Sequence, residues 1–317
     1  MKAEWSEIRD LLVDPEDHSP LAEAARGVAL VSETGRRFEF VDGQPVFLSP
    51  DGLELSGWRF PPIVVGDLQR PKPQRRGRRI AKLVKRVFEP AGSRRDAVNE
   101  FGELLASAGA SPLLLVVGGA TEGDALAALL RSDGVRVVAF DIYPTDETAF
   151  VADAHRIPLA DESVDGVIVQ AVLEHVYRPE VVVAEVERVV RAGGLVYAET
   201  PFMQPVHEGA YDFTRYTVSG HRLLFSGCDE LRCGPIGGPG ALINLACRGL
   251  VGGLIRSQAI AKAAYLLTLP LRSIDRLVDA RWRRDYAIGG YFVGRRKPSN
   301  DPAPADPAQI FELDDRS

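Results

Sequence analysis

Cysteine is scarce in this chain of 317 residues: there are three, Cys228, Cys233 and Cys247, and no two of them form a C-x-x-C pair. A disulfide framework and a cysteine-rich zinc module are therefore both disfavoured. Long apolar runs are missing as well, since the longest, residues 263–271, is too short to span a bilayer. The first ten residues carry charges throughout, so we expect no secretory signal peptide. These absences predict a protein of the reducing cytoplasm.

An overall excess of positive charge is also missing, because the formal net charge is −6. Binding to nucleic acid through the whole surface is therefore not expected. The charge is nevertheless uneven: residues 69–95 hold eleven Lys or Arg and one acid, a net of +10, which leaves −16 for the remainder. This stretch indicates a solvated linker and helix face; a contact with phosphate, acidic lipid or an acidic partner is the alternative.

Composition and periodicity divide the chain into four parts. Residues 1–50 contain short strand-like runs, and residues 51–100 form a connector rich in proline and arginine that leads into a helix. Residues 101–297 alternate between apolar runs and amphipathic segments, which is the pattern of an α/β domain with a parallel sheet. Residues 298–317 hold four prolines and a net charge of −4, as a disordered tail does.

The apolar runs locate individual elements. Asp42-Gly43, between two short runs, predicts a hairpin. Helices are predicted over 124–131 and 179–191, the second beginning with Pro179 and stopping at Gly193-Gly194. The predicted strands are 28–32, 37–41, 46–48, 113–117, 135–140, 164–170, 195–199 and 289–295.

A glycine-bearing turn follows the buried run 113–117. Gly118, Gly119 and Gly123 let the backbone approach a ligand and let the next helix point its N-terminus at that ligand. Asp141 stands 23 residues after Gly118, where a carboxylate can accept hydrogen bonds from both ribose hydroxyls. This combination predicts a nucleoside-containing cofactor. The turn fits either a nicotinamide dinucleotide or S-adenosylmethionine, and the glycines alone do not decide between them.

The following segments carry a family resemblance. Residues 153–165 read D-A-H-R-I-P-L-A-D-E-S-V-D, residues 170–176 read Q-A-V-L-E-H-V, and G-G and E-T-P-F follow at 193–194 and 199–202. This series resembles class I S-adenosylmethionine-dependent methyltransferases of the type 11 group, over about residues 101–235 and the last predicted strand. The resemblance implies a Rossmann-like α/β sheet with helices on both faces, methyltransferase activity and S-adenosylmethionine as cofactor.

The resemblance also implies cofactor contacts. The three glycines would line the methionine and ribose side, Asp141 would bind the ribose hydroxyls, and Ile142 would flank the adenine ring. Asp153 and the amide of Ala154 would meet the adenine edge, and Gln170 would form the floor beneath the methionine.

The match departs from the family at the start of the glycine motif. The usual acid is replaced by Val116, and the third small residue is Ala120. Glu122 is a candidate substitute for the lost contact to the methionine amino group. The departure leaves open an alternative function, a cofactor-binding but catalytically inactive partner protein.

Histidine is the natural base if the acceptor is a hydroxyl. His207 and His175 follow predicted strands at the edge of the sheet where ligands bind, and His207 is the first choice. A purely structural role is the alternative for each. His18, His155 and His221 are interpreted as structural or surface residues, with His155 capping the adenine loop.

Some relatives bind a divalent metal with E-x-x-E-H. Ala171 replaces the first Glu here, so only Glu174 and His175 remain and no metal site is expected.

Residues 200–216, which include His207, resemble a subgroup of methyltransferases encoded near glycan or cell-envelope genes. Tyr211 and Arg215 in this segment are candidate acceptor-binding residues. Asp212 could instead pair with Arg215 and fix the loop, so both readings stay open.

Residues 1–50 resemble a Trm112-like module, through the hairpin sequence at 35–48. The positions of that family's zinc cysteines hold Asp14, Asp17, Val31 and Thr34, so no soft-ligand zinc site is expected. Such a module would cover or rigidify the catalytic domain.

Amphipathic helices are predicted at about 241–280 as an insertion before the last strand. They would cover the acceptor pocket, contact a second copy in a homodimer, or rest on a membrane carrying a lipid-linked acceptor. The sequence as a whole predicts a methyltransferase acting on an oxygen of a small-molecule or glycan-type acceptor.

Overall fold

The computed structural model describes residues 5–24, 29–49, 52–55, 58–60, 93–119, 134–207 and 209–298. Some sequence predictions therefore lie outside the described residues. They are the helix over 124–131, Ala120, Glu122, Gly123, the basic stretch up to residue 92, and the tail from 299.

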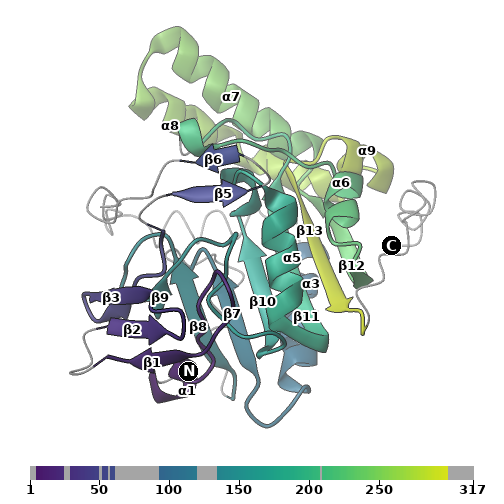
Figure 1. Cartoon of the computed structure of the whole chain (residues 1–317). Helices are drawn as coiled ribbons and strands as arrows, with labels where there is room; N and C mark the ends of the chain where they lie inside the picture. Colours follow the sequence, from purple (N-terminus) through teal and green to yellow (C-terminus); the bar gives the residue numbers. More distant parts are fainter. Residues whose placement is uncertain are drawn as a thin grey trace.

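A seven-stranded sheet forms the centre of the molecule, as Figure 1 shows. The strand order is β12-β13-β11-β10-β7-β8-β9. The five strands from β11 to β9 run parallel, and β13 is antiparallel to both of its neighbours. This is the predicted α/β sheet. Its strands are β7 (Leu113–Val117), β8 (Arg136–Asp141), β9 (Phe150–Val151), β10 (Val164–Gln170), β11 (Val190–Pro201), β12 (Cys228–Ile236) and β13 (Gly289–Arg296).

Both faces of this sheet are covered by helices. All five residues of β7 are buried, as expected for a parallel strand with helices on each side. Leu115 belongs to the core that contains Val182 and Val186 of α5 (Pro179–Val189). Leu114 belongs to a second core with residues of α3 (Ser93–Ala106). Alternation along the strand therefore divides its apolar side chains between two cores.

The helix expected over 179–191 is shorter than predicted, and Gly193-Gly194 do not end it. The chain is already extended from Val190, which pairs with Val164 of β10. The pairing then shifts, because the next partners are Gly166 and Leu195, so residues 191–194 form an irregular part of β11. Pairing with β10 takes precedence over continuing the helix.

The edge strand β12 was not predicted. Its sequence, CDELRCGPI, contains charges, a glycine and a proline instead of a continuous apolar run. Such residues are tolerated because β12 has a neighbour on one side only.

The N-terminal residues form a second, antiparallel sheet of order β1-β2-β3-β4. Asp42 and Gly43 have φ of 50° and 78°, which fits the tight hairpin turn that their sequence predicts. The strand expected at 46–48 is wrong: the second strand of the hairpin is β4 at Gln44–Pro45, and Val46 forms only an isolated bridge with Val151 of β9. The described elements here are α1 (Trp5–Arg9), β1 (Leu21–Glu23), β2 (Ala29–Ser32), β3 (Arg37–Val41) and β4 (Gln44–Pro45).

The N-terminal sheet is anchored to the domain at several points. The Phe47 N–H donates to the Val151 carbonyl at 2.8 Å, and the side chain of Gln44 donates to the Thr145 carbonyl at 2.6 Å. Leu12 forms a bridge with Leu159. Ile8, Leu12, Leu30, Phe38 and Phe47 share one core with the central sheet.

Charged and polar groups gather at Asp14, Asp17 and Thr34 of the N-terminal residues. Nε of Arg36 donates to Asp14 at 2.8 Å, and Nη2 donates to Asp17 at 2.6 Å. The hydroxyl of Thr34 also donates to Asp17, at 3.1 Å. Hydrogen bonds from Ser19, Thr34 and Arg36 lower the pKa of Asp17 to about 2. The Arg36 guanidinium thus links the turn between β2 and β3 to the segment between α1 and β1.

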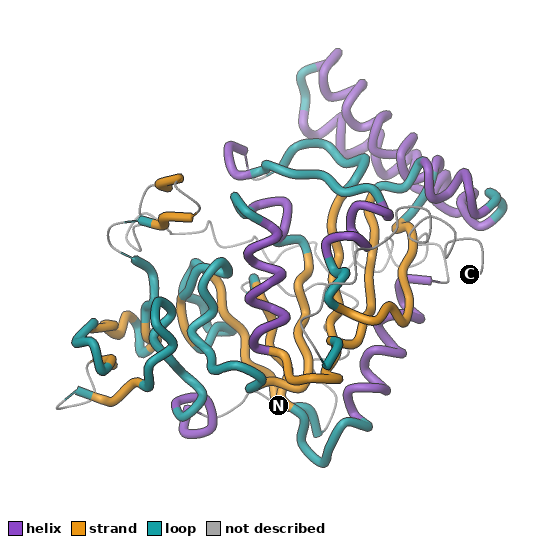
Figure 2. The backbone as a smooth tube through the Cα atoms, turned by 45° about the vertical axis from the view of Figure 1, so that its right-hand side comes forward, coloured by secondary structure: helices purple, strands orange, loops and turns teal. Residues whose placement is uncertain are grey.

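The helices between β12 and β13 lie beyond the end of the sheet to which the arrow of β10 points (Figures 1 and 2). The Asp275 carboxylate, 1% exposed, accepts the Gly240 and Ala241 N–H groups at the start of α7. A Cβ on Gly240 would lie 2.1 Å from the Leu271 carbonyl, so only glycine fits this approach. The elements are α7 (Pro239–Ile255), α8 (Gln258–Thr268), the 3₁₀ helix η4 (Leu269–Arg276) and α9 (Ala280–Asp285).

The amphipathic helices predicted at about 241–280 are thus present. None of the described helices combines the length and apolar character needed to cross a bilayer. The remaining described elements are β5 (Leu53–Leu55), β6 (Trp58–Phe60), η2 (Leu173–His175), η3 (Gly209–Tyr211) and α6 (Val218–Leu224).

His221 of α6 is structural, as predicted. Its ring is 1% exposed, lies edge-on to Phe225 at 5.3 Å, and its Nε2 has no hydrogen-bond partner. Burial lowers the pKa of this imidazole to about 3.

Buried His221 should make the fold acid-sensitive. The unfolded imidazole gains a proton below about pH 6.5, while the folded one stays neutral until about pH 3, so stability falls as the pH falls through this window. Denaturant unfolding at several pH values should show a loss that is steeper in the wild type than in His221→Phe, by on the order of 1 kcal/mol per pH unit. Equal slopes for wild type and variant, with exposed His18→Asn as control, would contradict this account.

Candidate functional site

The candidate site lies where parallel strands end at one edge of the sheet. β7, β8, β10 and β11 are neighbours and parallel, so the loops after them meet at their common carboxyl edge. Gly118 follows β7, Asp141 ends β8 and Gln170 ends β10. The loop that begins after β11 carries His207.

The glycine turn is tight on both sides. Gly118 has φ of 72°, and a Cβ there would lie 2.4 Å from Cγ2 of Val172. A Cβ on Gly119 would lie 2.6 Å from that of Ala139, and its N–H donates to the Phe140 carbonyl at 2.9 Å. Side chains are therefore excluded at both positions, and the backbone of the turn lies against the loop after β10.

Asp141 lies one strand away from this turn. Val117 of β7 pairs with Phe140 of β8, so Asp141 follows at the same edge as Gly118. The Asp141 residue is 9% exposed, and one carboxylate oxygen is 3.4 Å from the Tyr143 N–H. Ile142 is half-buried beside it. The carboxylate and the glycine turn thus occupy neighbouring strand ends, which their separation of 23 residues predicts.

The loop at 153–155 is organised by its histidine. Oδ1 of Asp153 accepts the His155 N–H at 2.9 Å and lies 2.6 Å from the ring Nδ1. Nε2 of the same ring accepts the Arg178 N–H at 3.2 Å, so the proton is on Nδ1. His155 is 3% exposed and caps this loop, as predicted, and Ala154 is also buried.

A polar cluster around one buried acid, Glu199, was missed by sequence reasoning and lies near the ends of β10 and β11. Nε2 of Gln170 donates to Glu199 at 2.8 Å. Arg94 of α3 donates to both oxygens of Glu199 at 2.7 and 2.9 Å, and the Tyr197 hydroxyl donates to one of them. Glu199 is 6% exposed, and burial raises the pKa of Tyr197. The signal in the sequence is a lone acid ending an apolar run, but nothing there identifies Arg94 as its partner.

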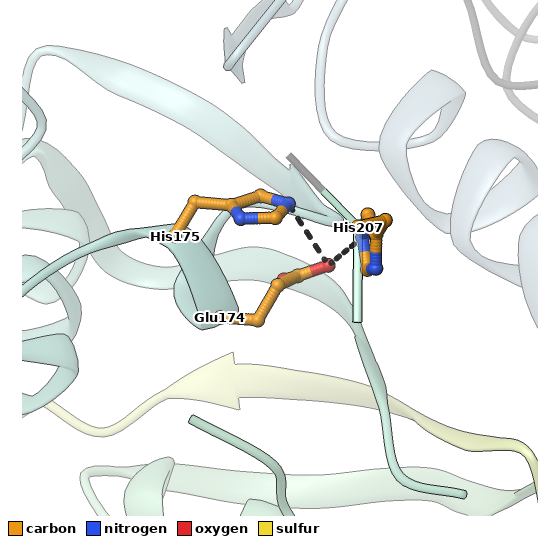
Figure 3. Close-up of side chains that lie close together, drawn as sticks. All are labelled: Glu174, His175 and His207. Carbon is orange, nitrogen blue, oxygen red and sulfur yellow. Dashed lines mark ion pairs between the residues drawn. The ribbon is translucent and has the colours of Figure 1, made fainter. Parts of the chain in front are cut away.

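The two predicted catalytic histidines lie together, with a buried glutamate between them (Figure 3). Glu174 and His175 belong to η2 after β10, and His207 belongs to the loop after β11. Oε1 of Glu174 is 3.7 Å from Nε2 of His175 and 3.6 Å from Nε2 of His207. The two rings are nearly perpendicular, with centroids 4.8 Å apart.

Glu174 is unusual because it is buried and ionisable. The residue is 1% exposed, and neither carboxylate oxygen has a hydrogen-bond partner. Burial raises the pKa of Glu174, and the nearby His175, His207 and Arg215 oppose this shift. Such a group is found more often at a functional site than in an ordinary core.

The loop after β11 is tied to η2 by its own hydrogen bonds. The Phe213 N–H donates to the Glu174 carbonyl at 2.7 Å, and the His207 N–H donates to Asp212 at 2.8 Å. Arg215 donates from both terminal nitrogens to the two oxygens of Asp212 and holds the pKa of that carboxyl well below its usual range. This pairing fits the alternative in which Arg215 fixes the loop instead of binding the acceptor. Tyr211 is 62% exposed at the rim of the cluster.

Glu174, His175 and His207 are a group of three residues that could hold a metal ion, since one ligand atom from each lies within 4.8 Å of the others. The E-x-x-E-H motif supplies only two ligands in this chain, Glu174 and His175. The tertiary structure adds His207, which is 32 residues further along the chain and was not considered as a ligand.

Comparison with protein-family models gives one match: residues 117–198 match the family described as "Methyltransferase domain". No curated protein matches the chain. The matched segment begins at the last residue of β7 and ends inside β11, so it contains Asp141, Gln170 and His175 of the candidate site.

Solved structures with distant likeness are numerous. A putative sarcosine dimethylglycine methyltransferase from Galdieria sulphuraria is 16% identical, with a TM-score of 0.41, 67% of this chain covered and 92% of that one. A methyltransferase from Archaeoglobus fulgidus described as SAM-dependent is 13% identical, with a TM-score of 0.40 and coverages of 68% and 99%. A chain from the complex of the Haloferax volcanii Trm112 methyltransferase activator with a putative methyltransferase is 19% identical, with a TM-score of 0.39 and coverages of 64% and 91%.

Loss of the Asp141 carboxylate should weaken binding of S-adenosylmethionine. Two charge-assisted hydrogen bonds to the ribose would be lost, so we expect Kd for Asp141→Ala to rise about tenfold to hundredfold by calorimetry. Asp146→Asn, a change of an exposed acid in the next loop, is the matched control and should leave Kd unchanged. An unaltered Kd for a folded Asp141→Ala protein would remove Asp141 from the cofactor site.

Proposed function

We propose that this S-adenosylmethionine-dependent methyltransferase transfers the methyl group to a hydroxyl oxygen of a small-molecule or glycan-type acceptor. The observation that carries the proposal is the arrangement of the sheet edge. A glycine turn and Asp141 end two adjacent strands, and a pair of imidazoles follows the next two strands of the same edge.

The cofactor residues act by positioning. Gly118, Gly119 and Gly123 would line the methionine and ribose, with Asp141 on the ribose hydroxyls and Ile142 beside the adenine. Asp153 and the Ala154 amide would bind the adenine edge, and Gln170, held by Glu199, would form the floor.

The reaction is an in-line displacement, in which positioning supplies most of the rate. The acceptor oxygen attacks the methyl carbon, the carbon–sulfur bond breaks with its electrons passing to sulfur, and S-adenosylhomocysteine leaves. The hydroxyl proton passes to Nε2 of His207, or of His175. In both rings Nδ1 faces an oxygen acceptor, which leaves Nε2 with its lone pair.

Arg215 is paired with Asp212, so its role toward the acceptor would be to shape the loop that presents Tyr211. The inactive-partner alternative derives from Val116 and from the N-terminal module without zinc cysteines, and the match to the methyltransferase family model does not favour it.

The N-terminal residues would serve as a Trm112-like module without zinc. Arg36 pairs with Asp14 and Asp17 at the former cysteine positions, so a guanidinium takes the place of the metal as the cross-link. Anchoring through Phe47 and β9 next to β8 would stiffen the strand that carries Asp141. Cys228, Cys233 and Cys247 are unbridged thiols, which favours a cytoplasmic setting.

We also infer that the helices α7 and α8 rest on an anionic membrane surface that carries the acceptor. Exposed apolar side chains gather on them, with Leu267 81%, Leu254 75% and Leu250 65% exposed. No acidic residue occurs between Glu230 and Asp275, while Arg248, Arg256 and Lys262 are exposed. Apolar side chains interspersed with cations are what an anionic lipid interface binds.

Removing the His207 imidazole should slow methyl transfer without weakening cofactor binding. We expect His207→Ala to lower the rate of labelled-methyl incorporation into hydroxyl acceptors of a native cell extract about 100-fold or more. The Kd for S-adenosylmethionine should stay within about twofold, because the ring lies on the acceptor side. His18→Asn is the control. An unchanged rate for His207→Ala, or label found only on nitrogen or sulfur, would refute the proposed role.

Charge and apolarity of α7 and α8 should govern membrane binding. The full chain should sediment with vesicles of phosphatidylglycerol and phosphatidylcholine, and the double change Leu254→Glu and Leu267→Glu should reduce the bound fraction at least about tenfold. Leu223→Glu, at an exposed apolar residue of α6, should bind as wild type does. Failure of the wild type to sediment, with a dimer in solution that the double change dissolves, would assign this surface to a second copy instead.

A further inference from the structure

The carboxylate of Glu174 lies between two imidazole nitrogens at separations close to those of ligands that share one ion, and the three ligand atoms all lie within 4.8 Å of one another. In a tetrahedral site with bonds of about 2.1 Å, ligand atoms lie about 3.4 Å apart. The separations from Oε1 of Glu174 to the two histidine Nε2 atoms are 3.7 and 3.6 Å. No proton lies between these atoms in a hydrogen bond, and Figure 3 shows both rings directed at the carboxylate.

The other nitrogen of each ring, Nδ1, faces an oxygen acceptor, as it commonly does in metal-bound histidines. Nδ1 of His175 is 2.6 Å from the Tyr211 carbonyl oxygen, which can only accept, so the proton is on Nδ1. Nδ1 of His207 faces the Pro205 carbonyl at 3.4 Å and the Asp212 carboxylate at 3.5 Å. Outer partners of this kind fix the tautomer that presents the Nε2 lone pair to a metal.

Glu174 lacks the hydrogen-bond donors that normally compensate a buried carboxylate for the loss of water. Other buried acids among the described residues have donors: Asp14 has Arg36, Glu199 has Arg94, and Asp275 has two backbone N–H groups. Glu174 is equally buried, and neither of its oxygens receives a hydrogen bond. A cation placed between it and the two imidazole nitrogens would satisfy all three at once.

We propose that Glu174, His175 and His207 bind one divalent transition-metal cation, such as Zn²⁺, through Oε1 and the two Nε2 atoms. Two imidazoles and one carboxylate are a ligand set suited to such ions, and three protein ligands leave at least one position open. The cation-binding part of the inference stands on the cluster alone. Its link to catalysis rests on the proposed function.

In the metal-bound state the histidines are ligands, and the cation replaces them in activating the acceptor. The hydroxyl oxygen would bind at the open position, where the cation lowers its pKa. Its proton would pass to water as the oxygen–carbon bond forms and the carbon–sulfur bond of S-adenosylmethionine breaks with its electrons passing to sulfur, so no external oxidant or reductant is needed. A sugar hydroxyl is a suitable acceptor, because a hard oxygen ligand can complete the coordination.

Metal titration of the full-length protein tests the site directly. Protein stripped with chelator should bind one Zn²⁺ per chain by calorimetry, and Co²⁺ should give the visible absorption bands of four-coordinate cobalt. Glu174→Gln and His207→Gln should each weaken Zn²⁺ binding at least about tenfold and lose the cobalt bands. His18→Asn, an exposed histidine outside the cluster, is the matched control and should bind as wild type does.

Folding and function are monitored separately. The Kd for S-adenosylmethionine shows whether each variant is folded, and a variant that fails this check is replaced by His175→Gln. Zn²⁺ binding by the wild type no stronger than that of the folded Glu174→Gln protein would overturn the inference, even with methyl transfer intact. Stoichiometric Zn²⁺ binding without methyl transfer to any hydroxyl would support the site and refute the proposed function.

Discussion

The site depends on one steric constraint, the close approach of the glycine turn to the loop after β10. A side chain at Gly118 would collide with Val172, and one at Gly119 would collide with Ala139. Because these positions carry no side chain, the ends of β7, β8 and β10 can be brought to one edge with backbone groups exposed between them. Asp141, Gln170 and the η2 residues all take their positions from that edge.

Buried charge is the second organising feature, and the molecule treats it in two ways. At Glu199, Asp212 and Asp14, an arginine supplies directed hydrogen bonds to the carboxylate. The pairs at Glu199 and Asp14 join distant segments of the chain, and the pair at Asp212 fixes one loop. Such pairs hold geometry more than they add stability, since desolvation offsets much of the attraction. Glu174 has two imidazoles in place of an arginine. The difference separates a carboxylate that maintains the fold from one that is available to a ligand.

Two parts of the chain outside the central sheet lie at different edges of it (Figure 1). The N-terminal sheet extends the edge at β9 through Val46 and Phe47, next to the strand that carries Asp141. The helices α7 and α8 lie beyond the edge where acceptor chemistry is proposed (Figure 1). They expose leucines and cations. One addition would support the proposed cofactor side, and the other would bring the chain to its proposed acceptor.

Local sequence by itself determined much of this protein. The continuous apolar run 113–117, the Asp42-Gly43 turn and the separation of Gly118 from Asp141 each encode geometry within a few residues or one βαβ unit, so periodicity and turn chemistry reveal them. Only the tertiary structure decided that His207 meets Glu174 and His175, that Arg94 reaches Glu199 and that Arg36 joins Asp14 to Asp17. These contacts join residues 19 to 105 positions apart, and strand pairing and loop closure place them; no local preference of either partner specifies the other.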